Sequence, residues 1–376
     1  MSSRSGTDEY AQAGVDYRKI DPFKRVMVEL GKSTMDFPRR RQVAIERTLH
    51  SHGATFSYYG TRSHRWCSTQ EGLGNKNWIA EWMYEFGPKG RTYHEWIGWD
   101  AGLMAVNDVI AQGAMPVVYT DEVAAGDSEW FEDERRARDL AQGYYLLCEE
   151  VGMALPAGES PSLRYLVKAE PPVKSAPSFS GCVTGIIAPS WRLITGVELQ
   201  AGDCIIAAPS TGIHCNGISL VIKRGLGLPE QFLTKLPTGR TLGEEALLPT
   251  RSYVGLVETL LDAGVGIHAL LPGTGSGVSK IAFDERQFTY RIHSWFKGIP
   301  PLFPFMRELG VSLEGCLKTF NWGGGYYIFV PRYELARTLH LGQKAGYDLL
   351  EVGRVEEGER KVIFEPEGIT LSPPGE

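Results

Sequence analysis

The sequence lacks the patterns that mark several common classes of protein. Its six cysteines are scattered, with no C-x-x-C pair and no cysteine and histidine spacing of the zinc-finger kind. No uninterrupted run of about 18 apolar residues occurs, and residues 1–17 are polar, without the apolar core of a secretion signal. We therefore expect a cytoplasmic protein with free thiols and no association with a membrane.

An excess of basic residues is also absent. Lys and Arg number 39 against 45 Asp and Glu, which gives a formal net charge of −6. Binding to the backbone of a nucleic acid normally requires a basic surface. The charge balance therefore predicts no nucleic-acid partner, although a local basic pocket for one small anion stays open.

The best-known nucleotide and hydrolase motifs are missing as well. The sequence has no G-x-x-x-x-G-K-[ST] pattern, and no G-x-G-x-x-G opens a helix with an acidic residue about 20 positions later. It also has no H-E-x-x-H and no G-x-S-x-G. Standard P-loop and Rossmann nucleotide sites are therefore disfavoured.

What the sequence does contain is an alternation of strand and helix patterns, which is typical of an α/β protein. Apolar spacing predicts helices over residues 97–112 and 133–151 and a strand over residues 116–120. Asp21-Pro22 looks like the start of another helix, with a cap followed by proline at the first helical position.

The length of 376 residues, 43% of them hydrophobic, predicts two globular domains. We place the boundary after Ala188-Pro189, which gives domains 1–189 and 190–376. The acidic, proline-containing tail after Glu365 is expected to fray.

A glycine-rich segment in the first domain leads into an apolar helix pattern. It reads Glu71-Gly72-Leu73-Gly74-Asn75-Lys76. The glycines allow backbone N–H groups to approach a phosphate, while the carboxylate suits Mg²⁺ and the lysine suits phosphate charge. Taken alone, such a segment is more often an ordinary surface loop with a solvated lysine.

Acidic residues recur at other points of the first domain. Asn107-Asp108 lies inside a predicted apolar helix, where burial is costly unless the pair is bonded or coordinated. An outward-facing pair is an equally good interpretation. Asp121-Glu122 follows the predicted strand, and Glu159 follows Ala157-Gly158. Since Mg²⁺ prefers a few carboxylates plus substrate phosphates, acids from separate loops would suit a metal-nucleotide site.

Three glycine-rich segments lie in the second domain. Residues 210–217 follow a buried-looking strand and open a helix, and helix N-termini attract anions. His214 suits an acid, a base or a phosphate ligand, but a loop histidine with a local backbone partner is an equally good interpretation. Residues 273–277 and 323–325 fit either ligand loops or tight turns.

In their order along the chain, these segments resemble the aminoimidazole ribonucleotide synthetase family, also called the phosphoribosylformylglycinamidine cyclo-ligases. The similar segments are residues 10–17 (YAQAGVDY), 71–76, 97–100, 106–108, 112–116, 210–220 (STGIHCNGISL), 248–254, 273–277 and 319–325. They span nearly the whole chain in family order, which is far more specific than any single loop.

Several positions depart from the family pattern. The element D-G-V-G-T-K is E-G-L-G-N-K here, so Glu71 replaces Asp and Asn75 replaces Thr. The element G-G-E-T begins with Ala157, and Ser276 stands where T-G-G-G has a glycine. The side chain of Glu71 is one methylene group longer than that of Asp, so a bound metal would be shifted by roughly that length. The chain is thus a divergent member.

The resemblance implies a two-domain α/β fold, in which N-terminal sheets pair across a homodimer into a barrel and the C-terminal domain is an α/β sandwich. The active site would lie between the domains, near the dimer interface. The implied reaction belongs to de novo purine biosynthesis. ATP phosphorylates the formamide oxygen of formylglycinamidine ribonucleotide, an amidine nitrogen closes the ring, and aminoimidazole ribonucleotide, ADP and phosphate are released.

The resemblance also implies site residues, carried over position by position. The catalytic residues would be Lys76, Asp108 and His214. The Mg²⁺ ligands would be Glu71, Asp108 and Glu159. The residues binding ATP would be Glu71, Gly72, Gly74, Asn75, Lys76, Asn107, Gly158 and Glu159. The residues binding the ribonucleotide substrate would be Ser210, Gly212, His214, Asn216, Gly273, Thr274 and Gly275.

Two other hypotheses remain beside the cyclo-ligase. The altered E-G-L-G-N-K and A-G-E-S elements fit a paralogue of the same superfamily that acts on another amide or acid. Because substitutions gather in the predicted metal loops, a catalytically silent dimeric binding protein is the other alternative. We favour the cyclo-ligase because the expected polar residues persist at Lys76, Asn107, Asp108, Glu159 and His214.

Overall fold

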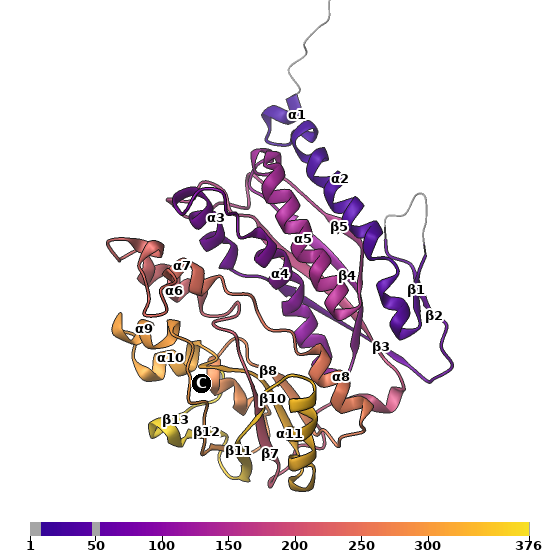
Figure 1. Ribbon diagram of the computed structural model, residues 1–376, viewed down its shortest axis with the longest axis vertical. Coiled ribbons are helices and arrows are strands. Elements are labelled where there is room, and N and C mark those ends of the chain that lie inside the picture. The colour runs from indigo at the N-terminus through magenta and orange to yellow at the C-terminus, as the bar shows by residue number, and fades with distance from the viewer. Residues whose placement is uncertain (1–8, 47–52, 376) are drawn as a thin grey trace, which may run out of the picture. The chain divides into compact units, whose positions relative to one another are not determined.

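The computed structural model describes residues 9–46 and 53–375, which form two compact units (Figure 1). The first unit comprises the residues up to 60, together with 70–102 and 117–183. The second comprises 61–69, 103–116 and the chain from 184 onward. The chain therefore passes into the second unit near the predicted boundary, but two short earlier segments also belong to that unit.

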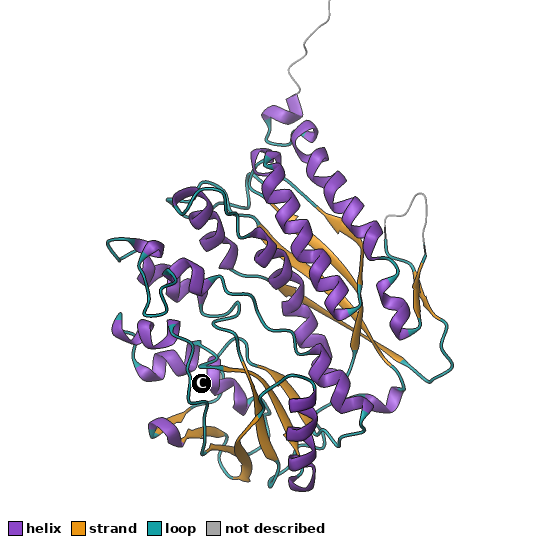
Figure 2. Cartoon of the chain, in the orientation of Figure 1, coloured by secondary structure: helices purple, strands orange, loops and turns teal. Residues whose placement is uncertain are grey.

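The first unit is built on a sheet of four strands with helices on one face (Figure 2). The strand order is β3, β6, β4, β5, and a two-stranded ribbon of β1 and β2 precedes it in the chain. The strands are β1 (Val43–Ile45), β2 (Phe56–Tyr58), β3 (Arg65–Gly72), β4 (Met115–Ala124), β5 (Ala154–Glu159) and β6 (Ser178–Ile187). The helices of this half are α1 (Glu9–Gln12), α2 (Tyr17–Thr34), α3 (Lys76–Phe86), α4 (His94–Val109) and α5 (Glu134–Val151).

Two predicted helices of this half are confirmed. Helix α4 covers most of residues 97–112 and continues as a short 3₁₀ turn that ends at Gly113, whose φ of 76° permits the left-handed stop. Helix α5 begins after Asp133, which accepts a hydrogen bond from the backbone N–H of Arg136 at 3.0 Å. The cap fixes the helix start where the sequence pattern placed it.

The predicted start of the first long helix is wrong. Helix α2 begins at Tyr17, and Pro22 lies inside it. The cap is Asp16, whose carboxylate accepts a hydrogen bond from the backbone N–H of Arg18 at 3.0 Å. The capping bond outweighs the loss of one internal helical bond at the proline.

Strand β4 is longer than the predicted strand and runs to Ala124. Asp121 and Glu122 therefore lie within the strand rather than after it. Because side chains alternate along a strand, the two carboxylates point to opposite faces of the sheet. Glu122 is exposed and accepts a hydrogen bond from Ser180 at 3.1 Å, whereas Asp121 is buried.

The second unit is built on a seven-stranded sheet in the order β13, β12, β9, β11, β7, β10, β8. The strands are β7 (Cys204–Pro209), β8 (Ala269–Pro272), β9 (Phe288–Ile292), β10 (Gly324–Val330), β11 (Leu350–Glu357), β12 (Lys361–Phe364) and β13 (Ile369–Leu371). The helices are α6 (Ile218–Gly225), α7 (Leu242–Ala246), α8 (Val254–Asp262), α9 (Leu302–Glu308), α10 (Leu313–Thr319) and α11 (Leu335–Lys344). The mixed α/β class predicted for both halves is confirmed.

The C-terminal tail is ordered, contrary to the prediction that it frays. Strand β13 pairs antiparallel with β12, and Leu371 is fully buried. A short apolar alternation at the end of the chain is enough to extend the sheet by one strand. Among the helices that the structure describes, none combines the length and the apolar composition that a membrane span requires.

A buried polar cluster holds the helices of the first unit together. Glu81 is its centre and accepts hydrogen bonds from the indole N–H of Trp130 at 2.6 Å and the guanidinium of Arg136 at 3.0 Å. Nε2 of His94 lies 3.0 Å from the same carboxylate. Burial favours a higher pKa for Glu81, but His94, Arg136 and the hydrogen bonds outweigh it and hold the pKa below its usual value.

Candidate functional site

The first glycine-rich segment is a strand end, a turn and a helix start. Glu71 and Gly72 are the last residues of β3, Gly74 has a φ of 70°, and Asn75 precedes the first residue of α3. A left-handed φ at position 74 explains a glycine there. Only residues 73–75 of this segment therefore lie outside a strand or helix, so the loop is shorter than predicted.

Lys76 is neither solvated nor part of a surface loop. It begins α3, its side chain is fully buried, and its Nζ lies 2.5 Å from a carboxylate oxygen of the equally buried Asp100. A buried ion pair of this kind joins α3 to α4. The phosphate contact of Lys76 stays a prediction, and in this structure the lysine serves to position the helix that follows the segment.

Asn107 connects α4 to a segment of the second unit that precedes α8. Its Nδ2 donates to the carbonyl of Arg251 at 3.0 Å, and its Oδ1 accepts from the backbone N–H of Tyr253 at 3.2 Å. The amide is 5% exposed, so both of its functional groups are used inside the protein. The outward-facing interpretation is therefore wrong for Asn107.

Asp108, the next residue, lines a cavity of about 630 Å³ within the second unit. Lys280 lies on the same wall and donates a hydrogen bond to the hydroxyl of Thr274 in the predicted substrate loop. The other polar residues of the lining include Thr69 and Gln112, and β8 contributes an apolar side. The cavity thus combines a carboxylate, a lysine and three uncharged polar side chains, the third being that of Thr195.

The pKa of the buried Tyr326 hydroxyl is affected by the charge of Asp108. Burial, with the charge of Asp108 as the next cause, raises the pKa of Tyr326 well above its usual value. Among the residues that the structure describes, none accepts or donates a hydrogen bond at this hydroxyl. The tyrosine therefore stays neutral and adds a polar group beside Asp108.

The predicted substrate loops of the second unit come together around Asn321. Its Nδ2 donates to the carbonyl of Gly212 at 2.9 Å, and its Oδ1 accepts from the hydroxyl of Ser210 at 3.0 Å and from the N–H of Gly323 at 2.9 Å. Gly273 donates to the carbonyl of Gly325 at 2.9 Å. One buried amide thus fixes the arrangement of two glycine-rich segments. Asn321 belongs to the family-like segment 319–325, but the sequence alone assigned it no role.

His214 lies inside this assembly. It is 3% exposed, has a φ of 58°, and its ring centroid is 6.3 Å from that of Tyr253. A Cβ atom at position 325 would overlap the Tyr253 hydroxyl and press on the histidine ring, so only glycine fits there. The backbone at Gly325 and the ring of Tyr253 therefore both pack against the imidazole.

Asn216 lies beside the third segment. Its Oδ1 is 3.6 Å from where a Cβ of Gly275 would be, and its buried Nδ2 has no hydrogen-bond partner among the described residues. A buried amide donor without a partner costs free energy, which a ligand with an acceptor group would recover. The predicted residues Ser210, Gly212, His214, Asn216, Gly273 and Gly275 therefore form one neighbourhood.

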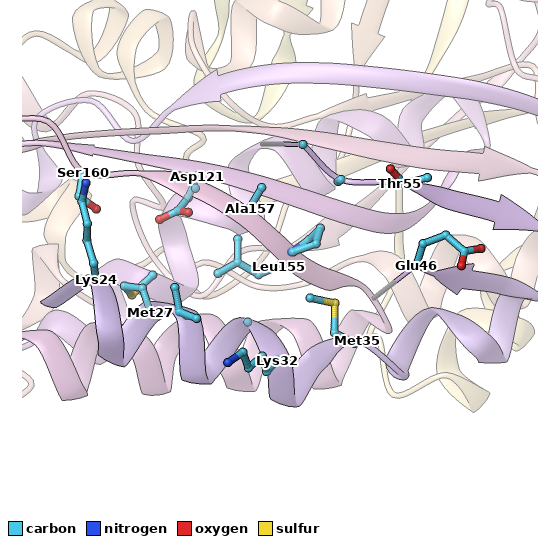
Figure 3. Close-up of a pocket in the computed structure, with 16 residues that line it drawn as sticks. Lys24, Met27, Lys32, Met35, Glu46, Thr55, Asp121, Leu155, Ala157 and Ser160 are labelled. Carbon is cyan, nitrogen blue, oxygen red and sulfur yellow. The ribbon is translucent and has the colours of Figure 1, made fainter. Parts of the chain in front are cut away.

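A second cavity, of about 690 Å³, lies within the first unit between α2, β5 and the segment around Thr55 (Figure 3). Lys24, Lys32 and Glu46 contribute its charged groups together with Asp121. The predicted residue Gly158 is part of the same wall. The sequence offered no reason to expect a cavity here, because its lining comes from four separate segments.

Asp121 is the buried acid of this cavity. Burial, with the charge of Glu159 as a further cause, raises its pKa to about 7 against a hydrogen bond from its own backbone. In the parallel pairing of β4 and β5 it lies opposite Gly158, where a Cβ atom would overlap its Oδ1. Among the described residues, no basic side chain is within ion-pair distance of the carboxylate.

Two of the carboxylates expected to bind Mg²⁺ lie at opposite edges of the four-stranded sheet. Glu71 is on β3 and Glu159 is on β5, which are the two edge strands of the sheet, with β6 and β4 between them. Neighbouring strands are about 4.8 Å apart, so the two edges are about 14 Å apart. Within residues 9–46 and 53–375, no group of three His, Cys, Asp or Glu side chains is arranged to hold a metal.

Comparison with protein families defines the class of this fold. Residues 62–187 match the family model of the AIR synthase related protein N-terminal domain, and residues 200–365 match that of the C-terminal domain. Within this class, the chain belongs to the phosphoribosylformylglycinamidine cyclo-ligase family. The cyclo-ligase of Thermococcus kodakarensis is 31% identical over 362 residues, covering 96% of this chain and 99% of that protein. That of Alkaliphilus oremlandii is 31% identical over 301 residues, covering 78% and 82%.

Solved structures agree with the fold. The hydrogenase maturation protein HypE in complex with ATP superposes with a TM-score of 0.59 at 18% identity, covering 87% of this chain and 89% of that one. Thiamine-monophosphate kinase from Stenotrophomonas maltophilia K279a gives a TM-score of 0.61 at 14% identity, covering 92% and 97%. The predicted family and two-domain fold class are confirmed.

Proposed function

We propose that this protein cyclises formylglycinamidine ribonucleotide to aminoimidazole ribonucleotide in de novo purine biosynthesis, with conversion of ATP to ADP and phosphate. The observation that carries the proposal is the match to cyclo-ligases over 96% of this chain and 99% of the relative.

The reaction needs a group that turns the formamide oxygen into a leaving group, and phosphorylation by ATP does so. Ring closure then takes place within one bound molecule, which gains from proximity. The remaining task of the protein is to position the reactants and to neutralise charge on the transferred phosphoryl group.

The cavity beside Asp108 suits the phosphoryl end of the nucleotide. Lys280 supplies a positive charge there and is already bonded to Thr274 of the glycine-rich loop. We assign Lys280 the phosphate role that the sequence suggested for Lys76, because Lys76 is paired with Asp100 and fully buried. Asn107 keeps Asp108 in place by fixing the end of α4.

The residues at this cavity also fit Mg²⁺. An ion that is held mainly by nucleotide phosphates needs only one or two protein carboxylates. Asp108 supplies one such carboxylate. When bound, the metal neutralises charge on the transferred phosphoryl group.

The second-unit loops suit the other reactant or its charged intermediate. The buried Nδ2 of Asn216 and the fixed ring of His214 offer polar groups at the ends of glycine-rich segments. His214 has the residue type for proton transfer near neutral pH. We therefore retain His214 as a candidate acid or base of the reaction.

The proposal includes a homodimer formed through the four-stranded sheet. The face opposite the helices carries exposed polar side chains such as Ser68 and Glu122, with Ser68 bonded to Thr184 at 2.9 Å. The large ring of Trp66 is 40% exposed on β3, at the edge of the sheet. A cytoplasmic location belongs to the same proposal and is supported by six cysteines that are all free.

The direct test is ADP release from Mg-ATP with and without formylglycinamidine ribonucleotide. We expect release that depends on the ribonucleotide and is lost in Asp108→Asn. Lys76→Ala is a poor control because it would open a buried ion pair. Absence of stimulation by the ribonucleotide would contradict the proposal and favour a paralogue acting on another amide or acid.

A further inference from the structure

The loop of residues 210–217 leaves the seven-stranded sheet at a point where strand pairing is irregular. Strand β7 ends at Pro209, which has no backbone N–H to donate. On the neighbouring strand β10, Gly324 pairs with Pro209 and Tyr326 with the residue before it, so the pairing skips Gly325. Regular strand pairing therefore ends where the loop begins, and the loop depends on other partners.

The side-chain amide of Asn321 provides such partners. Its Nδ2 donates to the carbonyl of Gly212 at 2.9 Å, and its Oδ1 accepts from the hydroxyl of Ser210 at 3.0 Å. The same Oδ1 accepts from the backbone N–H of Gly323 at 2.9 Å, which fixes the amide relative to its own turn. Because Asn321 is buried, a hydrogen bond lost there is not replaced by one to water.

The backbone beside these contacts is strained at two residues that are not glycine. The φ angle is 58° at His214 and 52° at Trp322. Left-handed values are unfavourable for residues with a side chain and persist only where the surrounding structure enforces them. Trp322 directly follows Asn321, and His214 lies two positions after Gly212. The hydrogen bonds of Asn321 are therefore made next to both strained positions.

The left-handed conformation determines where the imidazole of His214 lies. Its ring centroid is 6.3 Å from that of Tyr253, and it also packs against the backbone of Gly325. Tyr253 is itself fixed, because its hydroxyl donates to the carbonyl of Pro209 at 3.0 Å and its backbone N–H donates to Asn107 at 3.2 Å. A change of φ at position 214 to the ordinary negative range would turn the Cα–Cβ bond and move the ring away from this position.

We propose that Asn321 is a positioning residue of the reaction, because its amide holds His214 in the conformation that places the imidazole in the site. The inference rests on the proposed function and on the candidate role of His214 as acid or base. Both groups of the Asn321 amide are bonded to the protein, so Asn321 contacts no reactant. Its effect on the rate should therefore pass through His214.

Asn321→Asp tests the proposal with little change of shape. The substitution replaces the donor Nδ2 with an oxygen, which repels the carbonyl of Gly212. With Mg-ATP and formylglycinamidine ribonucleotide, kcat should fall by about 100-fold, the size of effect that misplacement of a reacting group produces. The KM for ATP should change by less than about threefold, since the substitution removes no contact to the nucleotide.

Thr289→Val is the matched control. It removes a buried hydroxyl of the same unit that donates to the carbonyl of Glu359 at 2.7 Å. Thr289 is on β9, which is separated from β7 by β11. The control should lower stability and leave kcat unchanged. Where Asn321→Asp does not fold, Asn321→Ser breaks the contact with Gly212 without adding a charge, and the same fall in kcat is expected.

A double-mutant cycle distinguishes positioning from a general loss of stability. His214→Gln removes the imidazole, so a residue that acts through the imidazole has nothing left to position. In the His214→Gln background, Asn321→Asp should lower the residual single-turnover rate by less than about threefold, against about 100-fold in the unchanged background. An equal fall in both backgrounds would show that Asn321 acts on the fold and would overturn the inference.

NMR of ¹⁵N-labelled histidine provides a readout that does not depend on activity. The imidazole signal of His214, assigned by its loss in His214→Gln, should shift in folded Asn321→Asp and stay in place in Thr289→Val. An imidazole signal that is the same in Asn321→Asp and in the unchanged protein would overturn the inference.

The outcomes for this inference and for the proposed function are distinguishable. If the unchanged protein turns over the ribonucleotide and folded Asn321→Asp does so at the same rate, the inference fails and the function stands. If the unchanged protein releases no ADP with the ribonucleotide, the function fails. The NMR comparison then still decides whether Asn321 holds His214 in place.

Discussion

Glu81 and Asp121 are two buried carboxylates of the same unit, and their pKa values are displaced in opposite directions. Glu81 is surrounded by an indole, an imidazole and a guanidinium that satisfy its charge. Asp121 lies on a cavity wall, where burial is not offset by any basic neighbour within ion-pair distance among the described residues. Glu81 stabilises the fold, whereas the buried position of Asp121 makes its ionised form unfavourable.

The difference in partners indicates which of the two buried acids is the better candidate for a functional role. A buried charge with complete partners is weak support for activity, since structural networks also displace pKa values. A buried acid that faces a cavity and has no basic side chain beside it retains its capacity to bind a ligand or a proton. Four expected outcomes follow from the comparison, from the largest effect to the smallest.

Glu81→Gln should lower the free energy of unfolding by about 3 kcal/mol or more, because it leaves Arg136 buried without its charge partner. Chemical denaturation at pH 7 measures the change. A loss below about 1 kcal/mol would contradict the structural role of the cluster.

Asp121→Asn should have the opposite effect and raise the free energy of unfolding at pH 8 by roughly 1–3 kcal/mol, because it removes an ionised group from a buried site. Denaturation of the ligand-free protein checks this, and a clear destabilisation at pH 8 would show that Asp121 is structural.

The pH dependence of stability should separate the two carboxylates. The folded pKa of Glu81 is below its unfolded value, so its stabilisation is complete above the unfolded pKa and is lost as the pH falls through the folded pKa. The folded pKa of Asp121 is above its unfolded value, so the protein loses stability as the pH rises from about 4 to about 7. The loss of stability at low pH should disappear only in Glu81→Gln. The loss between about pH 4 and about pH 7 should disappear only in Asp121→Asn.

Glu134→Gln should change the free energy of unfolding by only about 0.3–0.5 kcal/mol, since its pair with Arg138 is an exposed contact one helical turn apart. The same denaturation series measures it. A loss comparable to that of Glu81→Gln would mean that burial is not what distinguishes the carboxylates.

Much of the fold followed from local patterns in the sequence. The stop at Gly113 and the cap at Asp133 fixed two helices because both act through neighbouring backbone groups. Pro22 misled the prediction of α2, since a capping bond at Asp16 tolerates a proline further along. The end strand β13 was missed because a strand of three residues depends on its partner for stability.

The candidate site was predictable only in part. The order of the motifs predicted that Asp108 belongs to the site, because it lies in a recognisable segment. It also predicted the glycine-rich loops that Asn321 holds together. Lys280 and Asp121 carried no local signal, because their cavities are formed by segments distant in sequence. The burial of Lys76 was equally hidden, as it depends on Asp100 in the next helix.

The most direct measurement is the pKa of Asp121 and of Glu81 in the ligand-free protein, by carbon NMR of the labelled carboxyl groups. Asp121 should titrate near 7, whereas the pKa of Glu81 should lie below its usual value because His94 and Arg136 favour the ionised form. Titration of Asp121 near its ordinary value of about 4 would contradict the account.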